Sequence, residues 1–550
     1  MADPIAQLRD ALGAAVAAVA DDSLRTAPTL ERPPKPELGD YSTNAAMLLA
    51  PVRGEPPRAI AEDLRGELGE RLGPSALRIE VAGPGFLNLF LSDRWHRDAV
   101  AALLGEPAAV AESAETVVIE FVSANPTGPL TAAGGRHAAY GDALARMLAF
   151  TGRTVKREFY VNDVGGQVDR FAASIAARMR GRQPPPDGYA GDYVLELARE
   201  LERRGLGPDD LDELGRQGVE AMRARIETTL ERFGVRFDAW FSEREAHQSG
   251  RLGDAIEDLR SRGHVYESEG AVWLRTSELG DDKDRVLLRS GGEPTYFAAD
   301  IAYHRDKLER GARLIDLLGA DHHGYVGRMR AALEALGADP ERFEAMIMQL
   351  VHVVERGERA QMSKRKGEFV TLDELVDDIG VDAARYFMLQ RSHDTTLDLD
   401  LDLARRQSQD NPVYYVQYAH ARVASILRKA VAEGAAGSGG DVRADEYALA
   451  RAAATDRALA ASAEPSERAL VKRLLELRAE VEAAAGRRAP HRLSAYATQV
   501  AADFHAFYRD CQVVGAGDGL EPARLGLCVA AKRSIATTLE LLGVSAPERM

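Results

Sequence analysis

The chain has 550 residues, 86 acidic and 70 basic side chains, and a formal net charge of -16. At roughly 150 residues per domain, this length predicts three or four domains. A content of 45% hydrophobic and 28% charged residues is typical of a soluble globular protein and excludes a disordered or fibrous one. The acidic balance argues against a protein that coats nucleic acid through bulk charge, so any nucleic-acid contact must be local.

Residue usage also indicates the compartment. Cys511 and Cys528 are the only cysteines, too few for a disulfide framework or a four-thiolate zinc site and typical of a reducing environment. The sequence contains no run of about eighteen apolar residues, so no membrane-spanning helix is predicted. The early stretch LGAAVAAVA lacks a preceding cationic region, so we expect a helix of a cytoplasmic protein and not a signal peptide.

Residues 1–110 predict a small α/β domain. Apolar spacing favours a helix over 4–20 and another near 43–50, and the alternation in LRIEVAGPGFLNLFL indicates a hairpin. The stretch ALLGEPAAVAESAE that follows is typical of a linker.

Residues 111–372 predict a Rossmann-type domain made of two βαβ units. The first unit has a buried strand at 116–122, a Pro/Gly loop, a helix ending near Gly152 and a strand at 154–161. The second unit has a strand at 314–318, a helix over 326–337 and a returning strand at 346–354.

An insertion of about residues 165–290 separates the two units. It contains a charged helical segment over 191–233 and a strand-like part from Gly263 to Tyr296. After Leu372 strand signals stop, and residues 373–550 predict an all-α domain interrupted by the Gly/Ser-rich loop EGAAGSGGD.

Two segments have the composition of anion sites. The loop FVSANPTGPL lies between a strand and a helix, where free N–H groups and the helix dipole favour an anion, although a Pro/Gly turn is also ordinary connection chemistry. The segment QMSKRKG places three consecutive cations on a Gly-flanked loop that could close on a polyphosphate. Such a basic run is otherwise a solvated face.

The ordered set IEFVSANPTGPL, YVNDVGGQ, TYFAADIAYHRDK, GADHHGYVGR, MSKRKG, VDAARYFML and DNPVYYVQYAHAR resembles the arginyl-tRNA synthetases, a class I aminoacyl-tRNA synthetase family, over the whole chain. The resemblance implies a class I Rossmann catalytic domain with a connective insertion, an N-terminal domain that touches the tRNA elbow, and a C-terminal anticodon-binding bundle. It implies that ATP activates L-arginine as arginyl-adenylate before transfer to tRNA(Arg), with tRNA needed for the first step. Mg²⁺ is then expected to arrive with ATP and not in a protein-held metal site.

A guanidinium substrate needs carboxylates and planar acceptors, because its donors form a rigid fork. The resemblance assigns arginine binding to Glu120, Asn125, Tyr296 and Asp300. Tyr296 and Asp300 stand four apart, which places both on one face of a helix. Without the resemblance, Glu120 is equally well an outward strand residue, and the Tyr296 and Asp300 pair a helix cap with a core tyrosine.

The resemblance also assigns ATP and tRNA contacts. A metal site at His322 and His323 is disfavoured, because neighbouring side chains point apart and no acid accompanies them at ligand spacing. Tyrosine and arginine in the helical domain suit stacking on single-stranded bases, although core packing is the ordinary role of such aromatics. The expected ATP contacts are Pro126, Gly128, Thr131, Gly134, Gly319, Asp321, His322, His323, Gly324, Met362 and Lys366, and the expected tRNA contacts are Phe86, Asn88, Tyr414, Tyr418, Arg422 and Met550.

The class I signatures depart from the family pattern. Where the HIGH signature normally follows NPTGPL, this chain reads TAAG, so both signature histidines are missing, and the KMSKS counterpart begins with glutamine. We expect Ser363 and Lys364 to be catalytic, with the role of the lost histidines moved to Arg136 or His137. The backbone N–H groups from Ala132 to Gly135 are expected to face the triphosphate.

Three functional hypotheses follow. The chain is an active arginyl-tRNA synthetase, expected to be a monomer without membrane contact, or a paralogue that charges arginine for a biosynthetic pathway, or a tRNA-binding protein without catalysis. The guanidinium-pocket residues favour the first two, and the complete anticodon module favours the first.

Overall fold

The computed structural model describes residues 3–20, 27–105, 113–322, 324–359, 370–433, 448, 464–517 and 520–550. Within these ranges no helix is long and apolar enough to cross a membrane.

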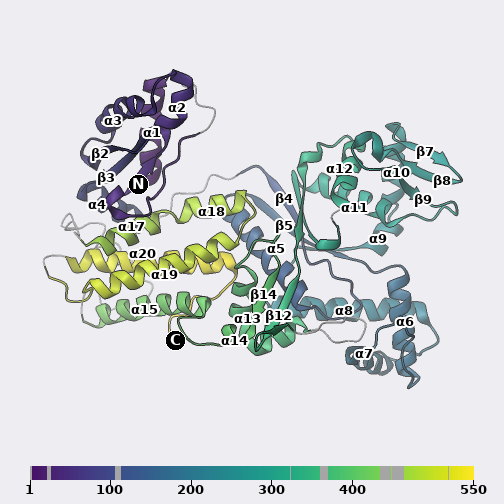
Figure 1. Ribbon diagram of the computed structural model, residues 1–550. Helices are drawn as coiled ribbons and strands as arrows, with labels where there is room; N and C mark the ends of the chain where they lie inside the picture. The colour runs from purple at the N-terminus through teal and green to yellow at the C-terminus, as the bar shows by residue number, and fades with distance from the viewer. Residues whose placement is uncertain are drawn as a thin grey trace.

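The N-terminal part is a small α/β unit, drawn in purple in Figure 1. The predicted helix over 4–20 and the predicted hairpin are confirmed. Its last helix contacts two helices of the C-terminal bundle. The elements are α1 (Pro4–Ala20), β1 (Tyr41–Thr43), α2 (Ala45–Arg53), α3 (Pro57–Leu72), β2 (Ala76–Ala82), β3 (Phe86–Leu91) and α4 (Asp93–Leu104), with sheet order β1-β3-β2.

A parallel five-stranded sheet with the order β11-β10-β4-β5-β6 forms the centre of the molecule. The chain leaves β4 toward β5 on one side and leaves β10 toward β11 on the other. Ligands of such sheets bind at the carboxyl ends of the strands where the order reverses, which here is the crevice between β4 and β10. The strands are β4 (Thr116–Glu120), β5 (Thr154–Val161), β6 (Ala239–Ser242), β10 (Arg313–Gly319) and β11 (Phe343–Met348).

The connecting helices are α5 (Ala132–Phe150), between β4 and β5, and α12 (Tyr325–Ala335), between β10 and β11. Both predicted βαβ units are therefore present. Helix α5 lies close to the strand layer because Gly141 faces the ring of Phe121, where a Cβ atom would clash. This close approach fixes the start of α5 beside the crevice.

The predicted insertion is not wholly separate from the sheet. Three helices lead from β5 to β6, and β6 is the edge strand of the central sheet. The sequence pattern missed β6 because its four residues, AWFS, are too few to show a period. The remaining elements are α6 (Gly166–Met179), α7 (Asp192–Arg203), α8 (Leu211–Arg232), α9 (Glu243–Gln248), α10 (Arg251–Ser261), β7 (Val265–Ser268), β8 (Ala271–Leu274), β9 (Arg285–Leu288) and α11 (Tyr296–Arg310).

Two strand predictions were wrong. The segment expected to be one strand over 346–354 is divided between β11 and β12 (Val351–Glu355), which belong to different sheets. The expectation that strands stop after Leu372 fails because β14 (Leu397–Asp400) pairs with β12, together with β13 (Glu358–Arg359). The short alternation LDLD becomes a strand because this pairing buries its two leucines.

The rest of the C-terminal part is helical, with α13 (Leu372–Met388) and α14 (Leu401–Ala404) leading into the bundle. Arg385 on α13 is fully buried and bonds Asp142 of α5 at 2.6 Å and the carbonyl oxygens of Phe233 and Leu542 at 3.0 and 3.1 Å. One side chain thus links the Rossmann-type part, the insertion and the bundle. The bundle helices are α15 (Pro412–Ala432), α17 (Pro465–Leu475), α18 (Leu477–Gly486), α19 (His491–Asp510) and α20 (Leu520–Leu542).

Candidate active site

Two adjoining pockets occupy the crevice at the carboxyl ends of β4 and β10. The loop pocket, of about 430 Å³, is lined by the loop after β4 and the start of α5. The acidic pocket, of about 390 Å³, contains Glu120, Asp300 and Asp316. The residues that line both are Val122, Ser123, Asn125, His137, Gln167, Gly319 and His322.

A strained turn joins β4 to the loop pocket. Val122 and Ser123 have φ angles of 70° and 38°, a region that a β-branched residue such as valine rarely adopts and that costs of order 1–3 kcal/mol. The turn places the Ser123 hydroxyl 2.8 Å from Glu120 Oε1, to which it donates, and it accepts from the Tyr160 backbone N–H at 3.1 Å. The strained turn therefore places Ser123 where its hydroxyl fixes one oxygen of the Glu120 carboxylate.

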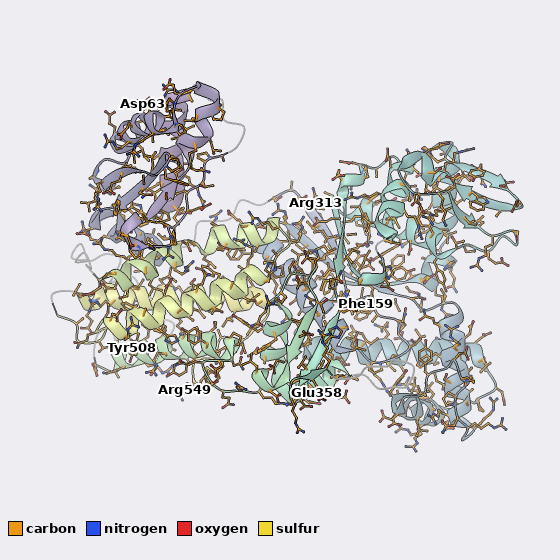
Figure 2. All side chains as sticks on the ribbon, viewed as in Figure 1. Asp63, Phe159, Arg313, Glu358, Tyr508 and Arg549 are labelled. Atoms are coloured by element: carbon orange, nitrogen blue, oxygen red, sulfur yellow. The ribbon has the colours of Figure 1, made fainter. Side chains whose placement is uncertain are left out.

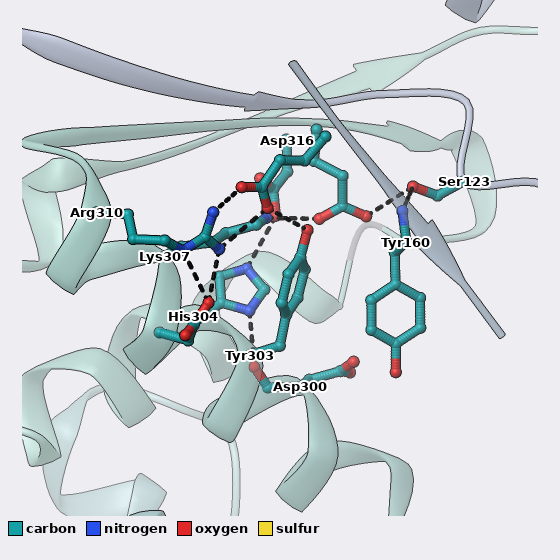
Figure 3. Close-up of polar contacts among 11 residues, drawn as sticks. Ser123, Tyr160, Asp300, Tyr303, His304, Lys307, Arg310 and Asp316 are labelled. Carbon is teal, nitrogen blue, oxygen red and sulfur yellow. Dashed lines mark hydrogen bonds and ion pairs between the residues drawn. The ribbon is translucent and has the colours of Figure 1, made fainter. Parts of the chain in front are cut away.

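The floor of the acidic pocket is an ion-pair network (Figure 3). Lys307, 0% exposed, donates to Glu120 Oε2 at 2.5 Å and to Asp316 Oδ1 at 2.7 Å. His304 Nε2 lies 2.8 Å from Asp316 Oδ2. Although burial opposes it, the Lys307 ammonium and the hydrogen-bonded His304 ring hold the pKa of Asp316 below its usual range.

Asp300 is the exception in this pocket. Its carboxylate forms no hydrogen bond or ion pair with any described residue, and Figure 3 shows it outside the dashed network. Burial, together with the nearby charges of Glu120 and Glu243, raises the pKa of Asp300 to about 7, against the opposing effect of His304 and Lys307. Among the described residues, the pocket therefore contains one half-buried acid without a cationic partner.

Tyr296 does not share the pocket of Asp300. It is 56% exposed and lines a separate outer pocket of about 440 Å³, where its hydroxyl lies beside Gly165. Helix α11 begins at Tyr296, so this side chain projects at the open end of the helix while Asp300 lies one turn further in. The tyrosines that line the acidic pocket are Tyr160, Tyr303 and Tyr325.

The insertion contributes to the loop pocket. Tyr193 of α7 donates from its hydroxyl to the Thr127 carbonyl oxygen at 2.9 Å, so the insertion holds the loop after β4. The lining of the loop pocket includes six of the expected ATP contacts, Gly128, Thr131, Gly134, Gly319, Asp321 and His322, but not Pro126 or Gly324. Asn125, expected to bind arginine, and His137 also line it. His323 lies outside the described residues. Gln167, Tyr189 and Tyr193 were not predicted as site residues. Gln167 ends the motif YVNDVGGQ, but its position beside the loop, like that of the two tyrosines, follows from the tertiary fold.

The start of α5 offers fewer free donors than expected. The N–H of Ala132 donates to the Val370 carbonyl oxygen, that of Gly134 to Thr131 Oγ1, and that of Gly135 to the Thr131 carbonyl oxygen. Among the described residues only Ala133 leaves its N–H without a partner within this stretch. The expectation that all four groups face a triphosphate is therefore wrong.

Arg136 and His137 are adjacent in sequence, but the first side chain points into the core and the second lines the pockets. Arg136 is fully buried and donates to the carbonyl oxygens of Gln349 at 3.0 Å and Ser392 at 2.8 Å, away from both pockets, so it is not placed to bind a phosphate. His137 lines both pockets. Burial, and next the charge of Arg136, lower the pKa of His137 to about 4, so its imidazole is neutral near pH 7.

Met362, Ser363, Lys364 and Lys366 lie outside the described residues. The chain immediately after them is described: the Val370 carbonyl oxygen accepts from Ala132, and the Leu372 N–H donates to the Leu130 carbonyl oxygen at 2.8 Å. The end of this segment is thus tied to the start of α5.

The expected tRNA contacts range from exposed to buried, and Tyr414, Tyr418 and Arg422 are half-buried. Tyr414 and Tyr418 stack with ring centroids 6.2 Å apart, and Arg422 lies 5.1 Å from the Tyr418 ring and 5.4 Å from that of Tyr508, which is labelled in Figure 2. Phe86 is 38% and Met550 54% exposed. Asn88, in contrast, is buried and accepts from the Ser42 hydroxyl, because its strand position faces inward.

Comparison with known proteins gives three family matches in chain order. Residues 6–91 match the arginyl tRNA synthetase N terminal domain, residues 207–410 match the tRNA synthetases class I (R) catalytic domain, and residues 416–550 match the DALR anticodon binding domain.

Whole-chain relatives agree with these matches. The chain is 46% identical to an arginine--tRNA ligase of Frankia alni, with 99% of this chain and all of the relative covered, and 42% identical to one of Carboxydothermus hydrogenoformans, with 95% and 94% covered. It superimposes on the arginyl-tRNA synthetase of Thermus thermophilus with a TM-score of 0.78 at 26% identity, covering 99% of this chain and all of the other. This chain belongs to the arginyl-tRNA synthetase family.

Proposed function

We propose that this protein attaches L-arginine to tRNA(Arg) in two steps. In the first, an oxygen of the arginine carboxylate attacks the α-phosphorus of ATP, forming arginyl-adenylate and releasing pyrophosphate. In the second, a hydroxyl of the terminal tRNA ribose attacks the activated carbonyl carbon, forming arginyl-tRNA and releasing AMP. The observation that carries this assignment is the acidic pocket with its unpaired Asp300 beside a loop pocket at the strand switch point.

Arginine fits the acidic pocket by charge. A guanidinium is cationic at every physiological pH and pairs bidentately with a carboxylate, and Asp300 is the half-buried carboxylate of this pocket that has no partner among the described residues. Glu120 and Asn125 line the same pocket, and each Glu120 oxygen retains a lone pair beyond its present bond. Tyr296 is proposed to contact arginine from the outer pocket at the entrance.

ATP is proposed to occupy the loop pocket, with the α-phosphate near the residues that both pockets share. Phosphoryl chemistry of this kind depends on positioning and charge stabilisation, not on a side-chain nucleophile. His137 stands at the shared boundary as a neutral donor in place of the missing signature histidines. The expected contacts Pro126, Gly324, His323, Met362 and Lys366 remain part of the proposal.

Lys364 and Ser363 are proposed to complete the phosphate site. Lys364 is six residues before Val370, whose carbonyl is bonded to the start of α5. Six extended residues span at most about 20 Å, so the lysine can reach a phosphate in the loop pocket. Mg²⁺ is proposed to enter as the ATP complex, because it prefers phosphate and water ligands to an all-protein cage.

The tRNA is proposed to contact the aromatic face of α15 and the exposed Phe86. Stacking of bases on tyrosine and arginine is tolerant of sequence and suits an unpaired anticodon loop. Asn88 can act there only by supporting Ser42, given its burial. Met550, which is exposed, belongs to the same proposal.

We further propose a cytoplasmic monomer without membrane contact. The two buried free cysteines are consistent with a reducing compartment.

The alternatives of a biosynthetic paralogue and a non-catalytic tRNA-binding protein are less well supported. A protein that only binds tRNA has no use for an unpaired acid in a pocket at the strand switch point. The DALR anticodon binding domain matched by residues 416–550 favours a ligase that charges tRNA over a paralogue with another acceptor. The test is aminoacylation with labelled arginine, ATP and tRNA(Arg), with lysine as a control, and pyrophosphate exchange with and without tRNA. We expect arginine-specific charging, and exchange that requires tRNA. Absence of charging with every tRNA would favour the non-catalytic hypothesis, whereas transfer to another acceptor would favour the paralogue.

A further inference from the structure

Lys307 is a fully buried cation to which the proposed reaction assigns no role. It reaches Glu120 on β4 and Asp316 on β10 from α11, and its ammonium lies 4.3 Å from the ring centre of Tyr303. Removing an ammonium from water costs several kcal/mol unless it is paired. The two carboxylates and the Tyr303 ring compensate for this cost, so the position of Lys307 calls for a functional explanation.

The two carboxylates that Lys307 binds face each other directly. Glu120 and Asp316 are register partners in the parallel pairing of β4 and β10. Like charges opposite each other on neighbouring strands are destabilising, and these two strands form the walls of the crevice. Lys307 donates to both carboxylates and offsets the repulsion between them.

The network also determines which acid remains open to a ligand. Glu120 uses one oxygen for Lys307 and the other for Ser123, and Asp316 uses one for Lys307 and the other for His304. Asp300 has no such partner among the described residues. A cation entering the acidic pocket thus meets two occupied carboxylates and one vacant one.

We propose that Lys307 is a positioning residue for arginine, which neutralises the facing pair Glu120 and Asp316 and thereby directs the guanidinium to Asp300. The inference rests on the proposed function, because it names the device that orients the substrate in that site. Lys307 itself does not touch arginine.

The charged and titratable groups around Lys307 come from three elements of the fold. Glu120 approaches from β4, Asp316 from β10, and His304 and Asp300 from α11. Beyond the Tyr303 ring, Glu158 on β5 is bonded by the Tyr303 hydroxyl and by Arg310, forming a separate closed pair. Among these groups Lys307 is one of the two that lower the pKa of Asp300.

A purely structural ion pair predicts a different result from a positioning residue. If Lys307 only joins two strands, its loss lowers thermal stability and leaves the pH dependence of arginine recognition unchanged. If it orients arginine, its loss also makes Asp300 harder to ionise. The pH profile of the KM for arginine separates the two roles.

The experiment compares the wild type with Lys307→Met, Lys307→Arg and Arg524→Met in aminoacylation at saturating ATP and tRNA. Arg524 forms a buried pair with Glu467 at 2.6 Å in the helical bundle, so it is a matched control for loss of a buried ion pair. In the wild type the KM for arginine should rise as the pH falls below about 7, because protonated Asp300 cannot pair with a cation. In Lys307→Met this inflection should move up by about one pH unit, the effect of one nearby charge, which raises the KM at neutral pH about fivefold.

Lys307→Arg keeps the charge and should restore the wild-type inflection, while the KM for ATP stays unchanged throughout. A wild-type inflection in Lys307→Met, with only a lower Tm as in Arg524→Met, would overturn the proposal. Should Lys307→Met fail to fold, Glu120→Gln gives an opposite expectation: the ammonium then faces one acid fewer, and the inflection should move to lower pH. No movement, or movement upward, would again overturn it. Every comparison requires that the wild type aminoacylates tRNA. If it does not, the proposed function fails before the role of Lys307 is tested, so the two failures are distinguishable.

Discussion

The acidic pocket and the loop pocket share a wall and are built by opposite means. In the acidic pocket, buried charges hold one another in fixed positions, and a single carboxylate remains free. The loop pocket is formed mainly by backbone turns and small residues, with His137 at its boundary and with its expected cations on the segment that carries Lys364. The proposed amino-acid site is thus preorganised by electrostatics within the fold, whereas we expect the proposed nucleotide site to depend on the basic segment that precedes Val370.

This difference predicts which kinetic constant each substitution changes. Loss of an acidic-pocket group should appear in the KM for arginine, because that pocket binds the ground state. Loss of a loop-pocket donor should appear in kcat, because its contacts strengthen as charge develops on the phosphates.

The largest effect is expected for Asp300→Ala. The guanidinium would be buried without its charged partner, which costs about 2–5 kcal/mol, so kcat/KM for arginine should fall about 100-fold or more, mainly through the KM. Steady-state aminoacylation measures this, with Asp300→Asn as the isosteric control and the KM for ATP as the internal reference. An unchanged KM for arginine in Asp300→Ala would remove this residue from the pocket.

Lys364→Ala should come next. Removing one charged donor from a site that stabilises developing charge costs on the order of 100-fold in rate, so kcat should fall by about that factor with little change in the KM for arginine. Lys366→Ala is the matched neighbour, and pyrophosphate exchange isolates the first step. Equal losses in both variants would mean that the segment contributes only bulk charge.

His137→Ala is expected to lower kcat about fivefold. A neutral imidazole donates one ordinary hydrogen bond, worth about 1 kcal/mol, and cannot match the missing charge of a lysine. Since the pKa of His137 is lowered to about 4, its contribution should stay constant from about pH 6 upward. Wild-type turnover in this variant would disprove the transfer of the signature histidines' role to His137.

Arg136→Met should have the smallest effect on turnover and a clear effect on stability. The substitution leaves the buried carbonyls of Gln349 and Ser392 without donors, a loss of about 3 kcal/mol. Thermal unfolding should show a lower Tm, with kcat near the wild-type value at temperatures where the variant is folded. A large fall in kcat without a fall in Tm would return Arg136 to the catalytic residues.

The sequence predicts the architecture well where periodicity is long. Helices such as α5 and α15 and strands such as β5 carry enough residues to show their period. Short elements were missed, because four-residue strands such as β6 and β14 are stabilised by partners distant in the chain. Their formation is a tertiary effect that no local pattern reports.

The candidate site divides in the same way. Asp300 and Glu120 are expected from the chemistry of the substrate and the family motifs, and both line the acidic pocket. Lys307 ends the motif TYFAADIAYHRDK, but neither that motif nor local spacing predicts its pairing with Asp316, because the pairing depends on how β4, β10 and α11 meet. Arg136 was assigned wrongly because helical spacing does not tell which neighbour points to the pocket and which into the core.

The paired measurement of Asp300→Asn and His137→Ala in one aminoacylation assay tests the contrast between the two pockets most directly. We predict a crossed pattern: Asp300→Asn raises the KM for arginine with little change in the KM for ATP, and His137→Ala lowers kcat with little change in the KM for arginine. If both variants changed the same constants in the same proportion, the two pockets would not be separate sites for arginine and ATP.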